Sequence, residues 1–133
     1  MTTPAPFFAD LADGPEGGRA VWAETPDRVR IRIGIWAGGE SGTVLLMPGR
    51  TEYVEKYGRT ARDLLARGYA TVAVDWRGQG LAARALPDRL VGHVGDFDEY
   101  QRDVDTLIAV AQQEGLPRPY FLLGHSMGGC IGL

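Results

Sequence analysis

The chain of 133 residues has little cysteine and little histidine, and both scarcities restrict its chemistry. Cys130 is the single cysteine, so no disulfide can form within the chain. The two histidines, His93 and His125, are far apart in sequence and do not form the histidine and cysteine clusters that bind transition metals. The sequence therefore predicts a protein without an internal disulfide, without a metal site and without a cofactor.

Long hydrophobic runs and an excess of positive charge are also missing. No segment approaches the roughly 20 apolar residues of a membrane-spanning helix, and residues 1–8 contain no basic cluster of the kind that opens a signal peptide. The net charge of −3 argues against nucleic acid as a partner. We therefore predict a cytoplasmic protein that binds no nucleic acid. Peripheral contact with the inner membrane surface and the oligomeric state stay open.

The first part of the chain predicts an arm and a hairpin. Residues 1–18 are rich in proline, glycine, alanine and aspartate, which predicts an irregular N-terminal arm ahead of a domain over 19–133. A strand is expected over Ala20–Glu24, and a Thr-Pro-Asp turn follows it. Val29–Ile35 alternates apolar and charged side chains, which is typical of a strand with one solvent-facing side. These segments predict an antiparallel hairpin at the edge of a sheet.

Three continuous apolar segments alternate with helical patterns in the rest of the chain. Continuous apolar character is expected of strands covered on both faces, whereas apolar residues three or four apart predict amphipathic helices. Asp96 and Glu99 have the spacing of an N-terminal capping box for the second helix. Strands are expected over Thr43–Met47, Tyr69–Val74 and Tyr120–Leu123, and helices over Tyr53–Arg67 and from Asp96 to about Gly115. This order predicts an α/β fold with a mostly parallel sheet and helices on both faces.

A serine stands where the third apolar strand meets a helix. Gly124-His125-Ser126-Met127-Gly128 has the Gly-x-Ser-x-Gly pattern, and it follows a predicted strand and opens a predicted helix. In this context the serine hydroxyl is raised above the sheet edge, and the flanking glycines avoid clashes between strand and helix. We therefore predict that Ser126 is a catalytic nucleophile, with Gly124 and Gly128 supporting the turn.

A serine nucleophile needs hydrogen-bond donors for the oxyanion that develops during acyl transfer. The turn itself supplies one donor, the backbone N–H of Met127. The second donor is expected from the loop after the first buried strand, where Gly49 permits a close backbone approach and the N–H of Arg50 follows. Arg50 and Met127 are therefore the predicted oxyanion hole.

The base that would activate this serine is not evident in the chain. His125 lies inside the turn, and its side chain is expected to point away from Ser126. His93 lies in a glycine-rich loop and is interpreted as structural. The chain order that accompanies this turn is serine, acid, histidine, and neither histidine of the chain follows Ser126.

Asp75 and Arg77 stand at the carboxyl end of the second buried strand. Open α/β sheets bind their ligands at this edge. We interpret the two residues as an ion pair that holds their loop close to the oxyanion loop and so supports the site. Direct contact with the substrate is the alternative.

These motifs resemble the α/β-hydrolase superfamily, and within it the bacterial lysophospholipase L2 and monoacylglycerol lipase-like branch. The resemblance covers Ala20–Leu133 and rests on the turn around Ser126, on the Asp-Trp-Arg-Gly-Gln-Gly sequence from Asp75, and on Pro48–Glu52. Pro48 stands where the family has a loop histidine. The family also has its acid and histidine after the nucleophile. The resemblance thus implies that 19–133 is the N-terminal half of one hydrolase domain, which is truncated after the turn around Ser126. It also implies that this half alone is catalytically incompetent.

The resemblance implies a serine hydrolase that cleaves carboxylic esters of lipids through an acyl-enzyme intermediate, with a small lipid ester as its substrate. Two alternatives stay open. One is another acyl transfer on the same fold, such as that of a thioesterase or a prolyl aminopeptidase. The other is a non-catalytic binding module that has kept the turn around Ser126 without its base.

Overall fold

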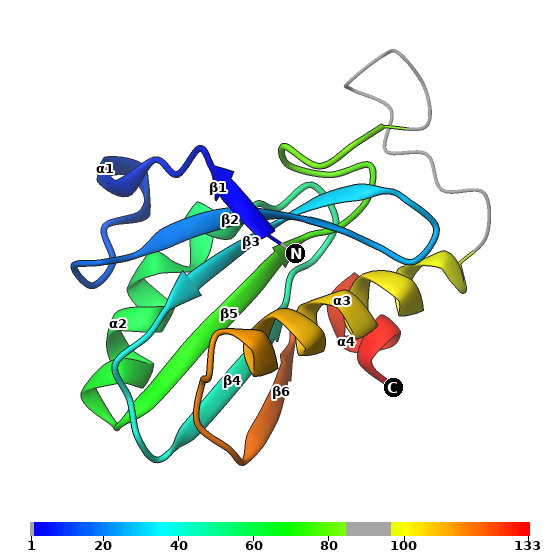
Figure 1. Cartoon of the computed structure of the whole chain (residues 1–133). Coiled ribbons are helices and arrows are strands. Elements are labelled where there is room, and N and C mark those ends of the chain that lie inside the picture. Colours follow the sequence, from blue (N-terminus) through cyan, green and yellow to red (C-terminus); the bar gives the residue numbers. More distant parts are fainter. Residues whose placement is uncertain (1, 85–96) are drawn as a thin grey trace.

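The computed structural model describes residues 2–84 and 97–133, which form one sheet with helices on both faces (Figure 1). The strands are β1 (Thr2–Ala5), β2 (Arg19–Glu24), β3 (Arg30–Trp36), β4 (Gly42–Met47), β5 (Tyr69–Asp75) and β6 (Tyr120–Gly124). The helices are α1 (Ala9–Ala12), the 3-10 helix η1 (Val54–Tyr57), α2 (Gly58–Ala66), α3 (Glu99–Gln113) and α4 (Met127–Gly132). Across the sheet the order is β1-β2-β3-β5-β4-β6. The pairs from β1 to β5 are antiparallel, whereas β4 is parallel to both β5 and β6.

Two apolar layers, one on each face of the sheet, follow from the alternation of side chains along the buried strands. In β4, Leu45 and Met47 pack with residues of α3 and α4, whereas Leu46 packs in the layer that contains Ala61 of α2. Figure 1 shows α2 on one side of the sheet and α3 with α4 on the other. The continuous apolar character of β4 and β5 therefore reflects burial on both faces, as predicted.

The segment before residue 19 is more regular than the predicted irregular arm. β1 pairs with β2, so the hairpin of β2 and β3 lies inside the sheet and not at its edge. Pro4 is tolerated in β1 because an edge strand does not need every backbone N–H. α1 lies against the start of α2, where a Cβ added to Gly58 would lie 2.1 Å from the Ala12 carbonyl oxygen. Tertiary packing therefore orders a segment that its composition marks as irregular.

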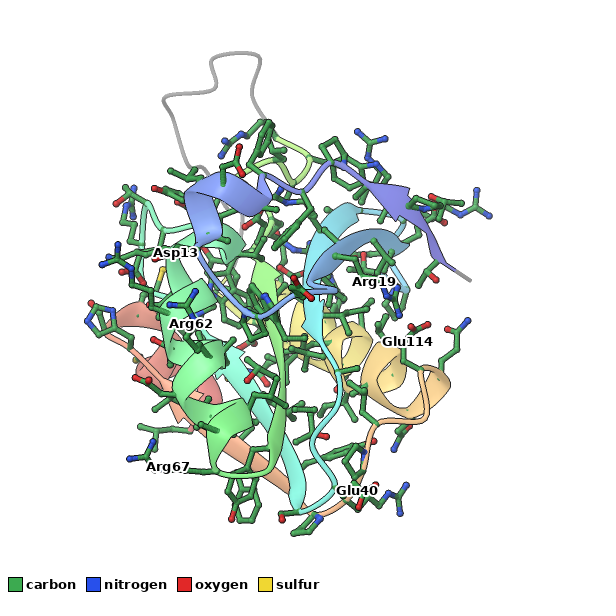
Figure 2. The ribbon with its side chains drawn as sticks, turned by 90° about the vertical axis from the view of Figure 1, so that its left-hand side faces the viewer. Asp13, Arg19, Glu40, Arg62, Arg67 and Glu114 are labelled. Carbon is green, nitrogen blue, oxygen red and sulfur yellow. The ribbon has the colours of Figure 1, made fainter. Side chains whose placement is uncertain are left out.

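Ion pairs on the surface also join this segment to the body. Asp13 contacts Arg59 and Arg62, each over 3.1 Å, and Figure 2 shows Asp13 and Arg62 on neighbouring elements. Exposed pairs of this kind contribute only about 0–1 kcal/mol each. The edge-to-face packing of Phe7 on buried Trp36, with ring centroids 5.8 Å apart, is the more important attachment.

β3 lacks the solvent-facing side that its alternating pattern predicts. Arg30 is exposed, but Arg32 in the same strand is only 1% exposed. The register places Arg32 opposite Asp75 of β5, and its Nε donates to Asp75 Oδ2 over 2.8 Å. Its terminal nitrogens donate to Glu55 of η1 over 2.7 and 2.6 Å. Two carboxylates thus replace water around the guanidinium, which allows the charged side chain to be buried.

α3 starts at Glu99, and the predicted capping residue Asp96 lies outside the described residues. The helix is followed by Gly115 with φ 69°, a left-handed conformation that suits glycine and ends the helix near the predicted position.

Across residues 2–84 and 97–133, no helix combines the length and the apolar character that a bilayer-spanning helix needs.

β6 forms an edge of the sheet, and its apolar side chains are less buried than predicted. Phe121, Leu122 and Leu123 are 45%, 56% and 42% exposed. β4 covers one side of β6, and no other strand of the described residues covers the second side. A continuous apolar segment predicts a strand correctly here, but it does not reveal how many neighbours the strand has.

Candidate active site

The connection between β6 and α4, residues 124–128 (the nucleophile turn), holds Ser126 in a conformation that is rare for a residue with a side chain. Ser126 has φ 55° and ψ −118°, outside the regions that L-residues normally occupy. The Gly128 N–H donates to the His125 carbonyl oxygen over 3.0 Å and closes the turn. A strained serine between a parallel strand and a helix is the geometry that raises a hydroxyl above the sheet edge.

Gly124 and Gly128 have no room for a side chain. A Cβ on Gly124 would lie 2.5 Å from the Cα of Gly129, and a Cβ on Gly128 would lie 1.8 Å from the Met47 carbonyl oxygen. Backbone atoms cannot move aside as the end of a flexible side chain can, so both positions require glycine. The two glycines let β6, α4 and the end of β4 meet at Ser126.

The loop after β4, residues 48–52 (the donor loop), lies directly against the nucleophile turn. The His125 N–H donates to the Met47 carbonyl oxygen over 3.0 Å. A Cβ on Gly49 would lie 3.2 Å from the His125 carbonyl oxygen, which shows how closely the two backbones approach. β4 and β6 are parallel neighbours, so their carboxyl ends and following loops meet at the same sheet edge. The structure thus brings the loop that contains Arg50 beside the turn that contains Ser126.

Side chains from the segment after β5 hold the donor loop from a second side. The Trp76 indole N–H donates to the Pro48 carbonyl oxygen over 2.8 Å, and the Gln79 side-chain oxygen accepts from the Thr51 N–H over 2.9 Å. Thr51 has φ 65°, which is costly for a β-branched residue. The sequence singles out neither Trp76 nor Gln79 individually, and their place within the motif that follows β5 is the signal that could have found them.

Glu52, at the end of the donor loop, is a buried carboxylate with 7% exposure. It accepts from the Gly49 N–H over 2.5 Å and from the Tyr57 hydroxyl, pairs with Lys56, and lies 3.2 Å from His125 Nδ1. Burial is the largest single influence and acts to raise its pKa, but the hydrogen bonds from Lys56, Tyr57, the Gly49 N–H and His125 together outweigh it and lower the pKa to about 2. The sequence carries no signal for the contact with His125, because 73 residues separate the two.

The predicted ion pair of Asp75 and Arg77 does not form. Asp75 faces its cross-strand partner Arg32, and burial raises the pKa of Asp75 although Arg32 opposes the shift. Arg77 pairs instead with Asp103 of α3 over 2.9 Å and with Asp27 of the β2–β3 turn over 2.7 Å. Asp75 still lies close to the donor loop. It accepts the N–H of the first residue of η1, the helix that follows this loop, over 2.9 Å.

Of the two histidines, the structure describes only His125. Its Nδ1 faces Glu52, and its side chain is 64% exposed. His93, interpreted as structural, lies outside the described residues.

In the ranges 2–84 and 97–133, no group of three or more histidine, cysteine, aspartate or glutamate side chains could hold a metal ion. What these ranges assemble is a strained serine with a donor loop beside it.

Comparison with known proteins gives a family match over most of the chain. Residues 38–133 match the family described as Serine aminopeptidase, S33. The chain is 44% identical over 91 residues to lysophospholipase L2 of Escherichia coli (strain K12), covering 66% of the chain and 26% of that protein. It is 34% identical over 105 residues to monoacylglycerol lipase of Mycolicibacterium smegmatis, covering 77% of the chain and 36% of that protein. The chain therefore spans only about a quarter to a third of the length of these relatives.

A solved structure matches the fold beyond the family region. An esterase of Pyrococcus furiosus superposes with a TM-score of 0.73, covering 98% of the chain and 49% of that protein at 18% sequence identity. Identity this low shows the fold alone. The likeness includes the N-terminal strands, which lie before the residues matched by the family.

Proposed function

The chain belongs to the Serine aminopeptidase, S33 family of α/β-hydrolases, and from this premise we propose that the whole protein is a serine hydrolase that cleaves carboxylic esters of lipids. The relatives named lysophospholipase and monoacylglycerol lipase support this substrate class. The observation that carries the proposal is the strained backbone of Ser126 in a turn whose glycines have no room for a side chain.

In the proposed reaction the Ser126 Oγ attacks the ester carbonyl carbon, and its proton passes to a general base. The carbonyl π electrons move onto the oxygen, and the N–H groups of Arg50 and Met127 stabilise the oxyanion. Collapse of this intermediate restores the carbonyl and breaks the bond to the alcohol, which takes up the proton. Water then attacks the acyl-enzyme in the same way, releases the fatty acid and restores the Ser126 hydroxyl.

The general base and its acid partner are assigned to no residue of the 133-residue chain. The resemblance places both after the nucleophile in chain order. Loss of a triad base lowers kcat by orders of magnitude, because an unassisted serine hydroxyl stays protonated. We therefore expect ester hydrolysis from the whole protein and not from these 133 residues alone.

The substitution Ser126→Ala in the whole protein tests the proposal. We expect hydrolysis of p-nitrophenyl esters to fall by at least ~10³-fold, while circular dichroism shows an unchanged fold. A fluorophosphonate probe should label the wild type at Ser126 and leave the variant unlabelled. An alanine variant with near wild-type turnover would refute the nucleophile assignment. A wild-type protein that neither labels nor turns over ester would favour the non-catalytic binding module.

The family description, Serine aminopeptidase, supports a second candidate, hydrolysis of the peptide bond after an N-terminal residue. A prolyl aminopeptidase and a thioesterase are the two forms of acyl transfer that the resemblance leaves open. A serine nucleophile with two backbone donors serves all of these acyl groups. Values of kcat/KM for a monoacylglycerol, a lysophospholipid, an acyl thioester and a prolyl arylamide discriminate among the candidates. If kcat/KM is higher for the prolyl arylamide than for the two lipid esters, a prolyl peptide replaces the lipid ester as the assigned substrate.

A further inference from the structure

We propose that Glu52 is a positioning residue for the oxyanion hole: its carboxylate ties the donor loop to the nucleophile turn and so directs the Arg50 N–H at the reacting carbonyl oxygen. The inference rests on the proposed function and adds a residue to it. Glu52 is neither the nucleophile nor an oxyanion donor, and it acts only through the backbone that it holds.

A single carboxylate oxygen bridges the two halves of the site. Glu52 Oε1 accepts the Gly49 N–H over 2.5 Å and lies 3.2 Å from Nδ1 of His125. Gly49 precedes the predicted donor Arg50, and His125 precedes the predicted nucleophile Ser126. The carboxylate therefore contacts the residue immediately before each of the two groups whose relative position decides whether an oxyanion is stabilised.

The backbone on both sides of the Arg50 N–H is fixed by side chains. Trp76 donates to the Pro48 carbonyl oxygen, Glu52 accepts the Gly49 N–H, and Gln79 accepts the Thr51 N–H. A peptide unit is planar, so fixing its neighbours leaves little freedom for the N–H between them. Among the hydrogen bonds of the described residues, Glu52 is the one of these three side chains that also reaches the nucleophile turn, at His125. Glu52 thus fixes the N–H relative to Ser126 through polar contacts.

The charge of Glu52 is compensated, as a carboxylate close to an oxyanion requires. An uncompensated negative charge would oppose the developing oxyanion, because like charges at short range repel. Lys56 pairs with Oε2, and the Tyr57 hydroxyl donates to Oε1. With 7% exposure the carboxylate is also largely removed from water, which strengthens each of these hydrogen bonds. The group holds the loop firmly without presenting net negative charge to the reaction.

The test uses the whole protein with Glu52→Ala, Glu52→Gln and the matched control Glu40→Gln. Glu52→Ala removes every contact, whereas Glu52→Gln keeps an acceptor for the Gly49 N–H and loses the charge that pairs with Lys56. Glu40 is exposed in the turn before β4, at the opposite end of that strand from the donor loop (Figure 2). Thermal unfolding identifies any variant that loses its fold.

The kinetic readout is kcat and KM on p-nitrophenyl butyrate, expressed per site titrated to its end point with a fluorophosphonate. Misplacement of one oxyanion donor should lower kcat about 10²-fold in Glu52→Ala and about tenfold in Glu52→Gln, with KM changed by less than about threefold. Glu40→Gln should match the wild type. A kcat for Glu52→Ala that stays within about twofold of the wild type would overturn the inference.

The second readout does not depend on activity. Hydrogen exchange of the backbone amide of Gly49 should be faster in Glu52→Ala than in the wild type and unchanged in Glu40→Gln, because the Glu52 carboxylate accepts this N–H. If the wild type neither turns over ester nor labels, the proposed function fails, and the exchange alone decides whether Glu52 holds the loop. Unchanged protection of Gly49 in Glu52→Ala overturns the inference in that case as well.

Discussion

At Arg50 the backbone and the side chain have separate roles in the proposed mechanism. The N–H is the oxyanion donor, and the side chain is exposed. Arg50→Ala keeps the N–H and should leave kcat/KM on neutral esters almost unchanged. Arg50→Pro removes it and should cost about 3 kcal/mol of transition-state stabilisation. Steady-state kinetics on p-nitrophenyl esters measure both. Equal, severe losses would assign the effect to the guanidinium, and a loss confined to lysophospholipids would identify a phosphate contact.

Gly128 and Gly129 are adjacent in α4 but have different surroundings. A Cβ on Gly128 would lie 1.8 Å from a carbonyl oxygen of β4, whereas a Cβ on Gly129 would meet nothing closer than 3.8 Å. Gly128→Ala should therefore lower the free energy of unfolding by about 3 kcal/mol. Gly129→Ala should change it by less than about 1 kcal/mol, since alanine favours helix over glycine. Urea denaturation of the whole protein compares the two, and equal stabilities would contradict the close approach of α4 to β4.

At the scale of elements, β3 carries one exposed and one buried arginine, and only the buried one should matter for stability. Arg32→Met leaves the carboxylates of Glu55 and Asp75 buried without their counter-charge, which costs about 3–5 kcal/mol. Arg30 stacks on the Trp22 ring at 4.0 Å, and Arg30→Met should cost about 1 kcal/mol or less. Chemical denaturation gives both values. A small loss for Arg32→Met would mean that water reaches the two carboxylates.

The sequence predicts best those elements that depend on local patterns. β4 and β5 follow from continuous apolar segments, and the nucleophile turn follows from its glycine spacing after a strand. Local patterns do not predict features that depend on pairing between segments distant in the sequence. β1 pairs with β2 through backbone groups, and Arg32 is buried only because the register places it opposite Asp75. The contact of Glu52 with His125 belongs to the same class, so the sequence singles out Ser126 as the proposed nucleophile but not Glu52 as its neighbour.

At the scale of the whole molecule, the two edges of the sheet differ. β1 is a short edge strand that contains Pro4, whereas β6 exposes Phe121, Leu122 and Leu123. An apolar edge with unpaired backbone groups promotes association. The 133-residue chain alone should therefore self-associate, and Leu122→Lys should shift it toward monomer. Leu11→Lys, at a position 61% exposed in α1, is the matched control and should not. Size-exclusion chromatography with light scattering measures this. A wild-type chain that is monomeric and unfolds cooperatively would contradict the expectation.

The separation of the two halves of the site in sequence also sets the order in which they are made. Glu52 and His125 are 73 residues apart, so at 5–20 residues per second the ribosome needs roughly 4–15 s to pass from one to the other. During that interval the side of β4 that later receives β6 is unpaired, and the donor loop has no nucleophile turn to contact. Each new molecule therefore completes the donor loop first and gains its serine seconds later. A pause in translation between the two segments would prolong the time for which β4 can pair with the wrong strand.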